Sequence, residues 1–134
     1  MPFVTETIGR VCRISLRVHK STIDVRDHGR GRLLPVAFQQ KGDDGMSVDW
    51  MKYRSAAESL ATTKVPVDNG VVSLNVGDVV DCNVEPLEVI HNPQANVDNY
   101  NQAHSLVKSI PKKNPNKTAV RLYLWQNYDW EILI

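Results

Sequence analysis

The regular alternation of apolar and polar residues near the N-terminus is the feature that most constrains the fold. Over residues 11–18, apolar side chains occupy the even positions and mostly polar ones the odd positions. The apolar set is Cys12, Ile14, Leu16 and Val18, and the polar set is Arg13, Ser15 and Arg17. A period of two places the two sets on opposite sides of an extended chain. The pattern therefore predicts a half-buried β-strand, and with it a sheet that covers a core on one face.

Other apolar runs are short, and glycine, proline or charged residues interrupt them, so they predict further short strands. The candidate strands cover residues 33–39, 46–50, 84–90 and 104–110. Pro35 in the first of these is typical of an edge strand or of a strand start. Asp68, Asn69 and Gly70 form the strongest turn signal, and the valines on both sides favour a hairpin or a tight entry into a strand there.

Two segments predict helices. Ser55, followed by Glu58 three residues later, matches a capping box, which predicts a short helix over residues 56–62. Residues 118–128 fit both helical and strand spacing. Asn116 or Thr118 as the N-cap favours a helix through residue 127, followed by an extended end over residues 130–133.

These elements together predict an α+β fold in one domain covering residues 1–134. We expect a mostly antiparallel, twisted sheet of five to seven short strands with two or three short helices. A chain of 134 residues is long enough to bury its own core.

The composition narrows the location and the chemistry. The chain has no apolar run long enough to cross a membrane, and Glu6 and Arg10 interrupt the N-terminal segment in a way that argues against a signal peptide. We therefore expect a cytoplasmic protein without membrane contact. Cys12 and Cys82 are too few for a disulfide framework and are expected to be reduced thiols. No motif predicts a cofactor.

The net charge of +1 conceals a segregation of charge along the chain. Residues 1–41 carry eight Lys/Arg and three Asp/Glu, residues 42–104 carry three and ten, and residues 105–134 carry five and two. One interpretation is that basic and acidic surfaces face each other within the monomer. The other is that the basic ends meet and form a phosphate-binding patch.

The polar segment between the apolar runs near residues 87 and 107 is the predicted site. His91 and His104 lie near its two ends, and imidazoles titrate near neutral pH, so two facing rings could act as acid and base on a phosphoester. Asn101 could orient a substrate or an oxyanion. Asn92 and Tyr100 are candidate binding residues, and a structural role for both histidines is the alternative.

Two further features are weaker candidates. The loop around residues 27–32 presents His28, Arg30 and Arg32 beside glycines, which suits phosphate binding but lacks the pattern of a P-loop. His91, His104, Asp98 and Asp49 could ligate a metal, but their spacing does not favour it, and no metal site is predicted. Asp49 is expected to face solvent.

The order of several short motifs resembles a loose group of small, uncharacterised bacterial proteins. The motifs are AF followed by G-x-SV-x-W over residues 37–50, VGDV at 76–79, V-x-H-x-P at 89–93 and AHSLV at 103–107. The resemblance implies that these segments deserve testing and implies no catalytic residue.

Two classes of function remain open. The first is a non-catalytic binding or accessory module, such as one from a mobile or defence-related gene, which contacts a protein or nucleic-acid partner or a second copy of itself. The second is a small hydrolase or phosphoesterase built on His91 and His104. The lack of a complete catalytic set favours the first.

Overall fold

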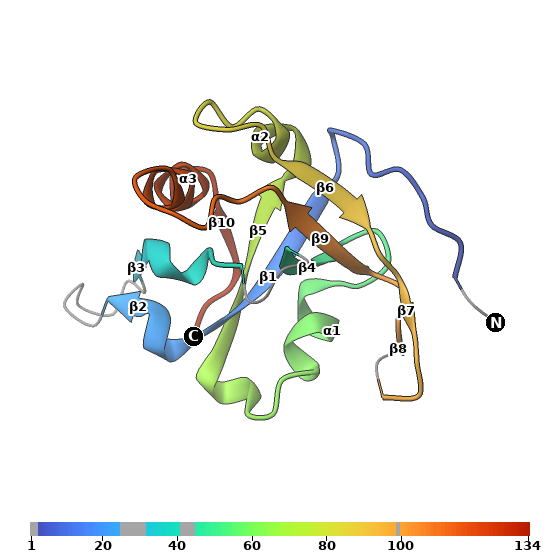
Figure 1. Ribbon diagram of the computed structural model, residues 1–134. Coiled ribbons are helices and arrows are strands. Elements are labelled where there is room, and N and C mark those ends of the chain that lie inside the picture. Colours follow the sequence, from blue (N-terminus) through green and yellow to red (C-terminus); the bar gives the residue numbers. More distant parts are fainter. Residues whose placement is uncertain (1–2, 25–31, 41–44, 99) are drawn as a thin grey trace.

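The protein folds around a six-stranded antiparallel sheet, shown in a computed structural model (Figure 1) that describes residues 3–24, 32–40, 45–98 and 100–134. The strand order is β10-β5-β1-β4-β9-β6. These strands are β1 (Arg13–His19), β4 (Met46–Trp50), β5 (Asn69–Asn75), β6 (Glu88–His91), β9 (His104–Lys108) and β10 (Asp129–Ile132). The predicted α+β fold with a mostly antiparallel sheet is confirmed.

The remaining elements are short. Two small two-stranded sheets pair β2 (Ile23–Asp24) with β3 (Arg32–Leu33), and β7 (Gln94–Ala95) with β8 (Tyr100–Asn101). The helices are α1 (Ala56–Ala61), α2 (Val76–Val80) and α3 (Asn116–Trp125), together with the 3₁₀ turns η1 (Lys20–Thr22), η2 (Pro35–Ala37) and η3 (Pro66–Asp68).

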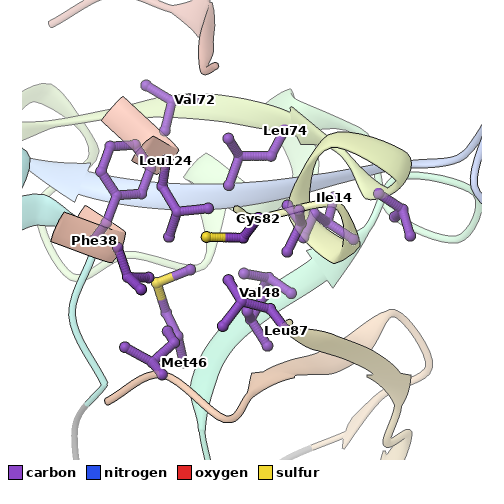
Figure 2. Packing of buried hydrophobic residues seen from close by; sticks show 14 of the residues in the cluster. Ile14, Phe38, Met46, Val48, Val72, Leu74, Cys82, Leu87 and Leu124 are labelled. Atoms are coloured by element: carbon purple, nitrogen blue, oxygen red, sulfur yellow. The ribbon is translucent and has the colours of Figure 1, made fainter. Parts of the chain in front are cut away.

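One face of the sheet carries the hydrophobic core. The even-numbered residues of β1 lie on this face as predicted, and Ile14 is fully buried opposite Leu74 of β5 and Trp50 of β4. Val79 of α2 and Leu124 of α3 belong to the same cluster. Figure 2 shows sheet side chains such as Ile14, Val48 and Leu74 gathered with Phe38, Cys82, Leu87 and Leu124.

Helix α1 contacts the opposite face of the sheet. The capping box predicted at its start is present, since the Ser55 side chain accepts from the Glu58 N–H and the Glu58 carboxylate accepts from the Ser55 N–H. The Ser59 hydroxyl then donates to Asp49 of β4, and Arg17 of β1 donates to Thr62. These polar contacts fix the short helix over the middle of the sheet.

The C-terminal helix and extended end are confirmed as α3 and β10. The N-terminal turn of α3 uses Asn114, whose side-chain oxygen accepts from the Thr118 N–H and hydroxyl. Trp125 donates its ring N–H to the Leu33 carbonyl at 2.5 Å, which joins α3 to the segment before η2.

Two predictions of local structure were wrong, and proline explains both. Residues 33–39 do not form a strand, because Pro35 begins the 3₁₀ turn η2 after β3 ends at Leu33. The strand predicted from residue 84 starts only at Glu88, after Pro86.

Of the two interpretations of Asp68–Gly70, the structure has the tight strand entry and not the hairpin. Asn69 and Gly70 instead open strand β5, after the 3₁₀ turn η3. Gly70 is required by the close approach of β10, because a Cβ atom there would lie 2.6 Å from the Ile132 carbonyl oxygen. Position 70 therefore requires glycine because of packing between two strands and not because of a hairpin turn.

Both cysteines are free thiols, with Cys82 buried in the core and Cys12 partly exposed. Among the residues that the structure describes, no helix has the length and apolar character needed to cross a membrane.

Candidate functional site

His91 is a buried residue whose ring nitrogens are both engaged. Its side chain is 3% exposed. The Glu6 N–H donates to Nδ1 at 3.0 Å, so the proton resides on Nε2, which donates to the Gln102 carbonyl at 2.7 Å. The ring also packs against Trp50 and Tyr53. This environment is that of a structural histidine.

His104 lies on the opposite face of the sheet from His91. His91 pairs with Ser105 in the ladder between β6 and β9, so His91 and Ser105 share a face, and the neighbouring His104 faces the other way. His104 pairs instead with Asp49 of β4. The structure therefore does not bring the two predicted imidazoles into one pocket, and an acid–base pair made of these two rings has no geometric support.

Among the residues that the structure describes, Asn101 forms no hydrogen bond with either histidine ring. Its amide nitrogen donates to Asp49 at 2.8 Å, and its oxygen accepts from the Ala103 N–H. Asn92 does meet His104, whose Nδ1 lies 2.8 Å from the Asn92 carbonyl oxygen. Tyr100 is exposed in β8 and its ring packs on Phe3. Figure 1 shows the β7–β8 hairpin projecting from the end of the sheet.

Of the three candidate residues in the basic loop, the structure describes only Arg32. His28 and Arg30 lie outside the described residues, so the structure does not place them. Arg32 belongs to β3 and stacks over the Trp125 ring at 4.8 Å from its centroid. In the described part of the chain, no group of His, Cys, Asp and Glu side chains is arranged to hold a metal ion.

A pocket of about 400 Å³ lies between the two central strands, β1 and β4. The ladder between them contains only the pairs Ile14–Trp50 and Ser15–Asp49, whereas β1 pairs with β5 over all seven of its residues. Beyond Ser15 the strands β1 and β4 have no further paired residues within the described chain, and the pocket lies along this stretch. We call it the β1–β4 gap. Its lining is Ser15, Leu16, Arg17, Val18, His19, Ser21, Thr22, Ala37, Gln39, Gly45, Met46, Ser47, Val48, Asp49 and Asn69.

Backbone polar groups of both strands point into the gap. The Met51 N–H donates to the Arg13 carbonyl, and the Trp50 N–H donates to the Ala103 carbonyl of the segment before β9. Because backbone groups alternate in direction along a strand, the odd residues of β1 and of β4 direct theirs toward each other. Arg17 and Ser47 thus present N–H and C=O groups to the gap instead of to a paired strand.

The closed end of the gap contains a buried polar cluster around Asp49. The Asp49 carboxylate is 3% exposed and accepts hydrogen bonds from the Ser59 hydroxyl and the Asn101 amide. It also forms an ion pair with Arg54, whose guanidinium nitrogen lies at 3.7 Å. The prediction that Asp49 faces solvent was wrong, because α1 covers this face. Ser15, directly opposite Asp49, is 2% exposed, and its hydroxyl has no hydrogen-bond partner in the described structure.

Glu6 in the N-terminal segment binds Lys52 and Tyr53, the residues that follow β4. We call these contacts the N-terminal clamp. Glu6 accepts from the Tyr53 hydroxyl and from the Lys52 ammonium, which lies at 2.9 Å. The Tyr53 hydrogen bond, followed by that from Lys52, lowers the pKa of Glu6 below its usual range. The same Glu6 hydrogen bond raises the pKa of Lys52. Figure 1 shows the N-terminal segment passing beside β6 on its way to β1.

Comparison of the chain with protein-family models, with curated proteins and with solved structures finds no match. The site is therefore defined by its geometry. The gap was not predicted, because nothing in the residues of β1 or β4 marks where their backbones separate. Ser15 carried no signal, since a polar residue between two apolar ones is the ordinary pattern of a half-buried strand.

Proposed function

We propose that this protein is a binding module that takes an extended segment of a partner protein into the β1–β4 gap. The observation that carries the proposal is that the ladder between two central strands stops after two pairs and a pocket of about 400 Å³ follows. That volume falls within the range of typical ligand sites, about 300–1,000 Å³.

The backbone groups along the two sides of the β1–β4 gap favour an extended peptide over other ligands. Arg17 and Ser47 direct backbone donors and acceptors into it, and such groups are satisfied most completely by another strand-like backbone. The buried hydroxyl of Ser15 adds a side-chain donor at the closed end. A bound segment would supply the hydrogen bonds that the missing part of the ladder lacks.

The side chains around the gap favour a particular pattern in the partner. Leu16, Val18, Met46 and Val48 line it from the core face of the strands, whereas Arg17, His19, Ser47 and Asn69 line it from the other face. Since alternate residues of a strand point to opposite faces, the preferred segment alternates apolar and polar residues.

The charge distribution supports a protein partner over nucleic acid. Basic residues near the N-terminus form ion pairs with the acidic middle of the chain, as in Arg10 with Asp81 and Lys20 with Asp68. Arg13 pairs with Asp129 of the C-terminal strand β10. These pairs match the interpretation in which opposite charges face each other within the monomer, and they leave less positive charge for phosphates.

The proposal is tested by NMR titration of the labelled protein with a library of short peptides in which valine alternates with serine or threonine. We expect chemical-shift changes centred on the amides of Arg17, His19 and Ser47. The same peptides with alternate backbone nitrogens methylated should not bind, because methylation removes the donors.

Two neighbouring substitutions provide the matched control. Ala37 lines the gap, whereas the adjacent Val36 does not and is 43% exposed. Ala37→Phe should abolish binding and Val36→Phe should preserve it. Shift changes confined to residues 91–104, or stronger binding of a single-stranded oligonucleotide with steep salt dependence, would contradict the proposal.

A further inference from the structure

His104 has a second neighbour that the sequence did not single out. Its Nε2 lies 3.4 Å from the hydroxyl of Ser47, which is two residues before Asp49, the residue directly opposite His104. The two side chains form a diagonal pair across β4 and β9 and share the face under which α1 packs. Ser47 is exposed and lines the β1–β4 gap.

The ring of His104 is held in the orientation that a general base needs. Nδ1 lies 2.8 Å from the Asn92 carbonyl oxygen, and a carbonyl only accepts, so the neutral ring carries its proton on Nδ1. Nε2 is then the free acceptor and faces the Ser47 hydroxyl. A nucleophile, a base and a group that orients the base are the three parts of an activated serine. The 3.4 Å separation is in the looser range found for such pairs without substrate.

The gap provides a place for the negative charge that such a reaction develops. The backbone N–H of Ser47 points toward β1, where the ladder has no partner for it among the described residues. The N–H of Arg17 points into the same gap from the other side. Amide donors that are already oriented toward a developing oxyanion are an effective source of rate acceleration.

We propose that Ser47 and His104 form a nucleophile–base pair that hydrolyses esters of short acyl groups. The Ser47 oxygen forms a bond to the acyl carbon while its proton passes to Nε2 of His104. The bond from the acyl carbon to the leaving oxygen breaks, and the imidazolium returns the proton to the departing alcohol. Water then attacks the acyl-serine, gives a proton to His104, and releases the carboxylic acid as Ser47 regains its proton.

The walls of the gap define the substrate class. Leu16, Val18 and Val48 line the gap from the core face, opposite the Ser47 side chain, so an acyl chain that passes from the Ser47 oxygen into the gap meets an apolar lining that suits a short aliphatic group. Ester hydrolysis goes beyond peptide binding and rests on different atoms. Peptide binding uses the backbone groups of β1 and β4 that line the gap, whereas hydrolysis uses the Ser47 hydroxyl and the His104 ring.

The experiment uses p-nitrophenyl acetate as the probe. The intact protein is incubated with the ester and quenched in acid, and its mass is measured by mass spectrometry. The acetylated residue is then identified by peptide mapping. We expect one acetyl group on Ser47 and turnover of the ester. Ser47→Ala should remove both, and His104→Gln should slow acylation by about 10²–10⁴-fold.

Ser109→Gly is the matched control, because Ser109 is an exposed serine outside the gap, and its φ of 73° is one that glycine adopts readily. This variant should acylate like the wild type. Circular dichroism tests whether each variant is folded. Unchanged acylation of Ser47→Ala, acetyl groups only on lysines, or no acylation of the wild type would overturn the proposal. Peptide binding measured on Ser47→Ala remains a separate result, since that variant keeps its backbone N–H.

Discussion

The two edges of strand β1 behave differently, although the same seven residues form both. Toward β5 every residue from Arg13 to His19 has a partner, whereas toward β4 only Ile14 and Ser15 do. The alternation of side chains is the same along both edges. Side-chain pattern therefore determines which face of a strand is buried, and it does not determine whether a backbone edge is closed.

The largest test of this difference compares two core substitutions in β1. Ile14 lies where both edges are closed and is fully buried, so Ile14→Ala should lower the free energy of unfolding by about 2–5 kcal/mol. Leu16 lies where the β4 edge is open and is half-buried beside the gap, so Leu16→Ala should cost about 1–2 kcal/mol. Urea denaturation measures both, and equal losses would mean that the gap is filled in solution.

A smaller test uses two serines that face each other across the closed edge. Ser15 and Ser73 are directly paired and both buried, but the Ser73 hydroxyl accepts from Arg13 and the Ser15 hydroxyl has no partner in the described structure. Ser73→Ala should therefore lower stability by about 1 kcal/mol, and Ser15→Ala should raise it by about as much, because it removes an unsatisfied buried hydroxyl. Thermal unfolding of both variants measures whether each substitution lowers or raises stability. A loss of stability in Ser15→Ala would show that its hydroxyl is satisfied.

The smallest expected effect is the pH dependence of stability that Glu6 contributes near the closed end of the gap. The pKa of Glu6 is lowered in the folded protein by its hydrogen bonds from Tyr53 and Lys52. Its contribution to stability is therefore complete above the ordinary glutamate value of 4.5 and is lost as the pH falls through the lower folded value. Tryptophan fluorescence during acid titration should report loosening around Trp50 in that window. Glu6→Gln should remove this part of the pH dependence, and an unchanged titration curve would assign it to other carboxyl groups.

The fold was predictable where local chemistry decides it. The period-two pattern around Ile14 identified β1, and the Ser55–Glu58 pair identified the start of α1, because both signals act within a few residues. The helix α3 followed by β10 was also predicted. The failure at Pro35 arose where a proline ended a strand. At Gly70 the sequence indicated a turn or a strand entry, but it could not show that the close approach of β10 leaves no room for a side chain there.

The site was less predictable, because it depends on contacts between distant segments. His91 and His104 flank one polar segment, but the register of β9 places their rings on opposite faces. Ser47 and His104 are 57 residues apart, and only the pairing of β4 with β9 brings them together. Asp49 was expected in solvent because the sequence did not show that α1 would cover it.

The order of strands in the sheet has a consequence for how the protein forms during synthesis. β1 lies at the centre of the sheet and is made first, yet both of its neighbours, β4 and β5, come later in the chain. Its long pairing with β5 joins residues as far apart as Arg13 and Asn75, which is slow to form because a large loop must close first. A nascent chain that has not yet passed Asn75 thus carries a central strand with at most its two pairs to β4, and chaperone contact should be concentrated on that early segment.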